Sequence, residues 1–133
     1  MVRLRFAPSP TGYLHVGGLR TALFCWFYVR QQGGKFIFRL EDTDQKRLVE
    51  GAENDLIRML EWAGIDLDEG PGIGGESGPY RQSERIEIYS RHVWKLLDDE
   101  NAYHCFCSAE RLEKLKAGQR ANGDTPRYDG FCR

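Results

Sequence analysis

The sequence predicts an α/β fold built on a parallel sheet, because its amino-terminal part runs as strand, helix and strand. Residues 2–6 alternate apolar and arginine side chains, which is typical of a strand with one buried face. Residues 18–32 form a mostly apolar run that ends at Gly33-Gly34, and glycine commonly terminates helices. Residues 35–40 return to strand-forming side chains. Two strands joined by a long helix make a βαβ crossover, which requires parallel pairing.

Three further segments carry helix or loop signals. Apolar side chains at three- and four-residue spacing predict a helix over residues 50–63. The glycine- and proline-rich residues 66–79 predict a loop. Ser83 is expected to cap a third helix that runs through Leu97.

The last thirty residues have a different character. Residues 102–107 (AYHCFC) are short and apolar, and we expect a strand or a knuckle there. Ser108 is expected to cap a helix over residues 109–120, and a turn-rich tail follows from Asn122.

The totals describe an ordinary folded chain. Its 133 residues leave room for one compact domain, and 41% hydrophobic with 29% charged residues is close to the globular average. A net charge of -1 provides no overall positive field, so any contact with nucleic acid must be local. No apolar run is long enough to cross a membrane, and the start of the chain leads straight into a strand without a signal peptide. We therefore expect a cytoplasmic protein with no membrane partner.

The segment between the first strand and the first helix has the features of a nucleotide-binding loop. Residues 6–20 read FAPSPTGYLHVGGLR and lie where open α/β sheets bind ligands. Gly17 and Gly18 would let a nucleotide lie against the backbone at the positive end of a helix. His15 could donate to phosphate oxygens as charge builds on them. The plainer alternative is a loop histidine among turn-forming prolines and glycines.

This segment resembles the first signature of the class I aminoacyl-tRNA synthetases, usually written HIGH and here HVGG. The wider string PSPTG-x-x-H-x-G-G-x-R-T-A-L-F is similar to that of the bacterial-type glutamyl-tRNA synthetases. Two further blocks match the family in the same order, residues 39–45 (RLEDTDQ) and 78–85 (GPYRQSER). The resemblance covers almost the whole chain. It implies an amino-terminal fragment of the catalytic domain.

The resemblance also implies an organisation and a reaction. Residues 1–100 would be the first half of a Rossmann-like nucleotide-binding fold, and residues 101–133 the start of a small insertion that faces the tRNA acceptor end. The implied enzyme is a glutamate-tRNA ligase, expected as a monomer, that activates L-glutamate with ATP and Mg²⁺ and transfers it to tRNA(Glu). The second signature of the class, usually KMSKS, is absent from these residues, so we expect the chain alone to be inactive.

The same resemblance assigns the residues of the catalytic loop. The catalytic positions would be His15, Gly17 and Gly18. The ATP-binding positions would be Pro8, Thr11, Gly12, His15, Gly17 and Gly18.

Glutamate needs a cation for its side-chain carboxylate and an anion for its ammonium. Arg5 and Glu41 fit these roles, because parallel pairing of their strands would bring both to one edge of the sheet. By resemblance the pocket would comprise Arg5, Ala7, Ser9, Glu41 and Thr43. Alternatively, Arg5 lies on a solvated strand face and Glu41 merely follows a strand end. Weaker candidates for tRNA contact are Arg47, Tyr80, Gln82, Ser83 and Arg85.

Three cysteines near the end of the sequence suggest a metal site. Cys105, Cys107 and Cys132 offer three thiolates, and a structural zinc ion takes four ligands. Tyr128 matches a tyrosine that serves this purpose in some relatives, while His104 or a residue beyond Arg133 are alternatives. The cysteines could instead be small apolar residues, as expected for Cys25 in its apolar helix.

The sequence also leaves two rival functions open. One is the related enzyme that attaches glutamate to queuosine in tRNA(Asp), against which the EDTD and GPYRQSER blocks argue. The other is a zinc-stabilised module that only binds nucleic acid or protein. An ATP titration would separate a nucleotide-binding enzyme from such a module.

Overall fold

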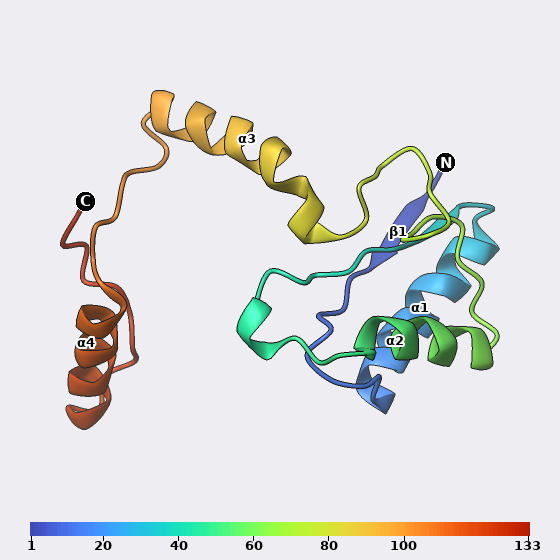
Figure 1. Ribbon diagram of the computed structural model, residues 1–133, viewed down its shortest axis with the longest axis horizontal. Helices are drawn as coiled ribbons and strands as arrows, with labels where there is room; N and C mark the ends of the chain where they lie inside the picture. The colour runs from blue at the N-terminus through green and yellow to red at the C-terminus, as the bar shows by residue number, and fades with distance from the viewer. The chain divides into compact units, whose positions relative to one another are not determined.

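The computed structural model describes residues 1–133 and divides them into two compact units, Met1–Ile86 and Glu87–Arg133. This division falls at the start of the third α-helix, whereas the boundary expected from the resemblance lies near residue 100 and stays a prediction. No helix is long and apolar enough to cross a membrane. The elements, coloured along the chain in Figure 1, are β1 (Arg3–Phe6), α1 (Val16–Gln31), β2 (Lys35–Phe38), η1 (Gln45–Arg47), α2 (Ala52–Trp62), η2 (Gln82–Arg85), α3 (Ile86–Asp98) and α4 (Ala109–Ala121).

The predicted βαβ crossover is confirmed. β1 and β2 pair in parallel, with Arg3 opposite Lys35 and Phe6 opposite Phe38. One face of this sheet packs into an apolar core to which both α1 and α2 contribute. The buried members are Phe6, Ala22, Val29, Phe36, Phe38, Leu40, Leu56, Leu60 and Ile65.

The glycine-rich segment is a loop, as predicted, but residues at its two ends pair with β2 and with Leu40 just beyond it. Isolated parallel bridges join Ile37 to Glu69 and Leu40 to Arg81. At the second bridge, the Leu40 N–H donates to the carbonyl of Tyr80 at 2.8 Å. The ends of the loop therefore occupy the position of a third parallel strand. This arrangement brings two sequence blocks, residues 39–45 and 78–85, side by side.

Two predicted helix starts are wrong. α1 begins at Val16 rather than Gly18, because the His15 side chain caps it. The helix expected from Ser83 starts instead at Ile86, after a short 3-10 turn. Ser83 caps nothing because its side chain is bonded to Asp42.

In the second unit, the prediction for α4 is correct and the strand considered for residues 102–107 is absent. The Ser108 side chain accepts from the Arg111 N–H at 3.2 Å, which confirms the predicted cap. Residues 102–107 form no strand. They belong instead to the loop that carries the first two cysteines of the cluster.

Candidate active site and metal centre

His15 is held against the first turn of α1. Its Nδ1 accepts from the Gly17 N–H at 3.1 Å, so a neutral ring carries its proton on Nε2, which remains available to donate. A Cβ atom on Gly17 would lie 3.0 Å from the imidazole Cε1. The absence of a side chain at Gly17 therefore lets the imidazole lie over the helix start.

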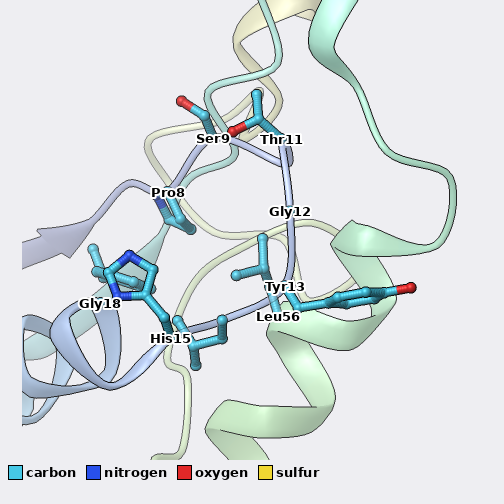
Figure 2. Close-up of a pocket in the computed structure, with 10 residues that line it drawn as sticks. Pro8, Ser9, Thr11, Gly12, Tyr13, His15, Gly18 and Leu56 are labelled. Atoms are coloured by element: carbon cyan, nitrogen blue, oxygen red, sulfur yellow. The ribbon is translucent and has the colours of Figure 1, made fainter.

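A pocket of about 420 Å³ opens beside this histidine. Figure 2 shows the loop from Pro8 to His15 along this pocket, and Leu56 of α2 also lines it. Five of the six residues predicted to bind ATP line the pocket, and Gly17 does not. The full lining is Phe6, Pro8, Ser9, Thr11, Gly12, Tyr13, Leu14, His15, Gly18 and Leu56. An apolar wall next to a helix amino terminus suits a base and a phosphate group respectively.

Arg5 and Glu41 lie on the same face of the sheet. Arg5 is registered with Ile37, so these two side chains share one face. Beyond the end of β2 at Phe38, the N–H groups of Arg39 and Glu41 still donate to the carbonyls of Phe6 and Pro8, so the alternation continues and puts both side chains on the side of Arg5. The Glu41 N–H donates to the carbonyl of Pro8 at 2.9 Å, which joins Glu41 to the wall of the pocket.

The two charges do not pair with each other. Arg5 is exposed and forms no hydrogen bond or ion pair, and Glu41 accepts only from Arg39. A free guanidinium and a carboxylate on one face are therefore open to a zwitterionic ligand.

Arg39 forms an ion pair with Glu41 that was not predicted from the sequence. Its Nη2 donates to Glu41 Oε1 at 3.0 Å, and its side chain is only 18% exposed against 35% for Glu41. Its Nε is buried without a partner. Period-two spacing from Ile37 could have placed Arg39 beside Glu41, but nothing in the sequence indicates the ion pair.

Asp42 ties the two neighbouring blocks together. It is 8% exposed and accepts from both the backbone N–H of Ser83, at 2.8 Å, and the Ser83 hydroxyl. Burial alone would raise the pKa of this carboxyl, but the bonds from Ser83 outweigh it and lower the pKa. Thr43 is exposed beside this junction.

Glu69 was not expected in any role, yet it is the most buried charged side chain, at 1% exposure. The Tyr80 hydroxyl donates to one of its oxygens, and Arg3 donates to the other at 2.6 Å. The bond from Tyr80, supported by the charges of Arg3 and Lys35, lowers the pKa of Glu69 despite its burial. This cluster fixes the base of the glycine-rich loop.

Of the residues suggested for tRNA contact, some are bonded within the protein and others are exposed. Tyr80 and Ser83 have the internal partners just described, and Arg85 donates to the carbonyl of Pro79 at 2.8 Å. Gln82 has a buried amide oxygen without a partner. Arg47 is exposed and pairs with Asp44 at 2.6 Å. A contact between any of these residues and tRNA stays a prediction.

The three cysteines of the second unit converge. The sulfur atoms of Cys105, Cys107 and Cys132 all lie within 4.8 Å of one another, and those of Cys107 and Cys132 are 3.5 Å apart. The Tyr128 hydroxyl lies 3.6 Å from both Cys105 Sγ and Cys107 Sγ. His104 stands apart from this cluster, with its ring against those of Trp94 and Phe106.

The donor set fits a tetrahedral ion. Zinc-sulfur bonds of about 2.3 Å imply sulfur atoms about 3.8 Å apart, close to the separation seen here. The hydrogen bond with Tyr128 lowers the pKa of the Cys132 thiol to about 7, so a thiolate is accessible near neutral pH. Cys25, in contrast, packs against the core of the first unit from α1.

Comparison with known proteins places these features in one family. The family model described as "tRNA synthetases class I (E and Q), catalytic domain" matches residues 1–133. The glutamate-tRNA ligase of Bacillus licheniformis is 55% identical over 132 residues, which are 99% of this chain and 27% of that protein. The corresponding ligase of Bacillus velezensis is 56% identical over 129 residues, which are 97% of this chain and 27% of that protein.

A solved structure agrees with the sequence comparison. The glutamate-tRNA synthetase of Elizabethkingia anophelis superposes with a TM-score of 0.89 at 48% identity, covering 96% of this chain and 26% of that one. The chain thus spans about a quarter of the length of the relatives it matches.

Proposed function

The chain belongs to the catalytic-domain family of the class I tRNA synthetases for glutamate and glutamine, and we propose that it carries the amino-terminal half of a glutamate-tRNA ligase active site. The observation that carries this proposal is the placement of Arg5 and Glu41 on one side of the sheet, with the Glu41 N–H bonded to Pro8 in the wall of the pocket beside His15. Glutamate-tRNA ligases are the relatives that match the chain over nearly its whole length.

Arg5 and Glu41 bind the amino acid. The Arg5 guanidinium grips the side-chain carboxylate through two parallel hydrogen bonds, which a lysine would not reproduce. Glu41 accepts from the α-ammonium through the oxygen that Arg39 leaves free. Ala7, Ser9 and Thr43 complete the pocket assigned from the resemblance.

The pocket beside His15 is the site for ATP, and Mg²⁺ bound with ATP would supply positive charge that offsets the charge of the phosphates. The α-carboxylate of glutamate attacks the α-phosphorus, a phosphorus-oxygen bond forms, and pyrophosphate leaves. His15 Nε2–H and the N–H groups at the start of α1 stabilise the charge that develops on the phosphate oxygens. A ribose hydroxyl of tRNA(Glu) then attacks the glutamyl carbonyl and AMP leaves.

Zinc is the metal that the cysteine cluster would hold. Cys105, Cys107, Cys132 and Tyr128 would be its four ligands, and the observation that supports this is the convergence of their sulfur and oxygen atoms. Bound zinc would supply a structural crosslink. These ligands would fix the loop around residues 102–107, in the insertion that faces the tRNA acceptor end.

The related queuosine-modifying enzyme is not favoured, because the relatives matched by the chain are glutamate-tRNA ligases. The expected cytoplasmic location and monomeric state remain predictions.

The proposal is tested by glutamate-dependent exchange between pyrophosphate and ATP, in the presence of tRNA, with the full-length gene product. Losing a charge-assisted bidentate contact costs about 3 kcal/mol, so Arg5→Ala should raise the KM for glutamate about 100-fold. Glu41→Gln should raise it similarly, while the KM for ATP changes little. Arg58→Ala, on the exposed side of α2, is the control. An unchanged KM for glutamate in both site variants would refute the proposal.

A further inference from the structure

One cation contacts the cysteine cluster directly. Arg111 lies in the first turn of α4, and its Nη1 donates to the sulfur of Cys107 at 3.4 Å. None of the ligands proposed above requires this contact. Arg111 therefore has a position beside the cluster that the zinc proposal leaves unexplained.

Arg111 is held on two further sides. Its Nη2 donates to Asp129 Oδ2, and its Nη1 also lies 3.4 Å from Asp129 Oδ1. Its guanidinium carbon lies 4.4 Å from the centre of the Phe131 ring. An arginine on an exposed surface usually has a mobile side chain, whereas Arg111 is restrained by both Asp129 and Phe131. The guanidinium is instead locked in the orientation that directs one donor at Cys107.

The same contacts connect the two halves of the cluster. Asp129 adjoins Tyr128, and its Oδ1 also accepts from the Phe131 N–H at 3.2 Å. The Cys132 N–H in turn donates to the Tyr128 hydroxyl at 2.9 Å. Arg111 thus links the loop that carries Cys107 to the turn that carries Tyr128 and Cys132.

The contact between Arg111 and Cys107 would balance the negative charge of a zinc-bound cluster. A zinc ion bound by three thiolates and a neutral phenol has a net charge of -1, which is costly at a partly buried site. A guanidinium that donates to one thiolate balances that charge and fixes the sulfur in place. Partners of this kind, beyond the ligands themselves, typically change metal affinity about 10- to 100-fold.

We propose that Arg111 is a positioning residue for the zinc site, in which it orients the Cys107 thiolate and balances the charge of the cluster. The inference rests on the zinc site included in the proposed function. It concerns metal retention and is independent of catalysis.

Competition between the 133-residue chain and a chromogenic zinc chelator tests the inference. Arg111→Met keeps the apolar stem and should raise the zinc dissociation constant about 10- to 100-fold. Lys114→Met, on the exposed side of α4, is the matched control and should leave the constant unchanged. Asp129→Asn keeps the cation but loosens its hold, and should give a smaller rise. If Arg111→Met fails to fold, Asp129→Asn carries the test.

A second measurement separates positioning from general stabilisation. With Co²⁺ in place of zinc, Arg111→Met should shift the thiolate-to-metal charge-transfer band, whereas Lys114→Met should not. Melting of the metal-free chain should be the same for wild type and Arg111→Met.

Equal zinc affinity of wild type and Arg111→Met would overturn the inference, and so would equal destabilisation of the metal-free and metal-bound chains by Arg111→Met. Absence of zinc binding by the wild type would instead refute the zinc site itself.

Discussion

Arg39 determines the orientation of the Glu41 carboxylate. Glu41 follows the end of β2 and has a flexible side chain, so its carboxylate needs a partner to stay in one orientation. Arg39, two residues earlier on the same face, is the more buried member of the pair and is bonded to only one oxygen of Glu41. The other oxygen remains free for a ligand.

This geometry predicts the behaviour of Arg39→Met in the full-length gene product. Glu41 should lose its fixed orientation, and the KM for glutamate should rise about 10-fold, the effect of roughly 1.4 kcal/mol. The KM for ATP should stay within a factor of two. Steady-state pyrophosphate exchange measures both constants. Equal rises in the two constants would indicate general damage to the fold and would contradict the prediction.

Ionisation of the Glu69 carboxyl should make the free energy of unfolding depend on pH. The pKa of its carboxyl is lowered from the ordinary value of 4.5, first by the bond from Tyr80, so folding favours the ionised form. Its contribution is therefore fully present above pH 4.5 and is lost as the pH falls through the lowered pKa. Glu69→Gln should lower the free energy of unfolding at pH 7, because the neutral amide loses the charge-assisted bonds from Tyr80 and Arg3.

Urea denaturation of the chain between pH 7 and pH 3 measures this effect. The gap between wild type and Glu69→Gln should narrow below pH 4.5. Glu76→Gln, which removes only an exposed partner of Arg3, should differ little from wild type at any pH. A constant gap across the whole range would exclude titration of Glu69 as the cause.

The elements of the first unit were predictable where local patterns decide the structure. The period-two alternation in residues 2–6 and the apolar run ended by Gly33-Gly34 are properties of neighbouring residues, and both led to the correct βαβ crossover. Parallel pairing was the basis for expecting Arg5 and Glu41 at one edge of the sheet, and their role in a glutamate pocket stays a prediction.

Contacts between residues far apart in sequence were not predictable. Ser83 has an ordinary capping sequence, but Asp42 lies 41 positions away and takes its side chain. The ends of the glycine-rich loop lack strand-forming patterns, and they pair with Ile37 of β2 and with Leu40 beyond it through isolated bridges only. The partners of Glu69 and Arg39 depend on that same pairing. The residue types therefore indicated that these side chains form polar contacts, but the identity of each partner depends on the tertiary structure and could not be predicted from neighbouring residues.

The backbones of β1 and β2 approach closely at Gly34, just before β2 begins. A Cβ atom on Gly34 would lie 2.2 Å from the carbonyl oxygen of Val2, which itself accepts from the Lys35 N–H. Gly34→Ala must push β1 and β2 apart at their first pair and should destabilise the chain by about 2 to 3 kcal/mol. Urea denaturation of the first unit measures this loss.

An alanine elsewhere provides the contrasting control. A Cβ atom on Gly118, inside α4, would meet nothing within 4 Å. Gly118→Ala should therefore stabilise α4 by about 0.5 to 1 kcal/mol. If Gly34→Ala were as harmless as Gly118→Ala, the close approach of the backbones at Val2 would be refuted.

The two units of the protein differ in how they are stabilised. Every buried apolar side chain belongs to the first unit, and the last of them along the chain is Tyr80. The second unit has helices and ion pairs, including Arg111 with Asp129, but no buried apolar core. Small units without a core usually depend on a crosslink or a metal ion. The cysteine cluster supplies the ligands for such an ion.

Metal removal should therefore unfold the second unit alone. With zinc bound, the backbone amides of α4 should exchange slowly with deuterium; after chelation they should exchange about as fast as an unstructured chain, because the folding free energy of such units is supplied by the metal. The amides of α1, which packs into the apolar core, should keep their protection in both states. Hydrogen-deuterium exchange followed by mass spectrometry reports both helices in one experiment. Cys132→Ser should reproduce the effect of chelation without any chelator, and Cys25→Ser should not. Unchanged protection of α4 after complete removal of zinc would mean that local interactions suffice to hold this unit together, and the structural role proposed for the metal would fail.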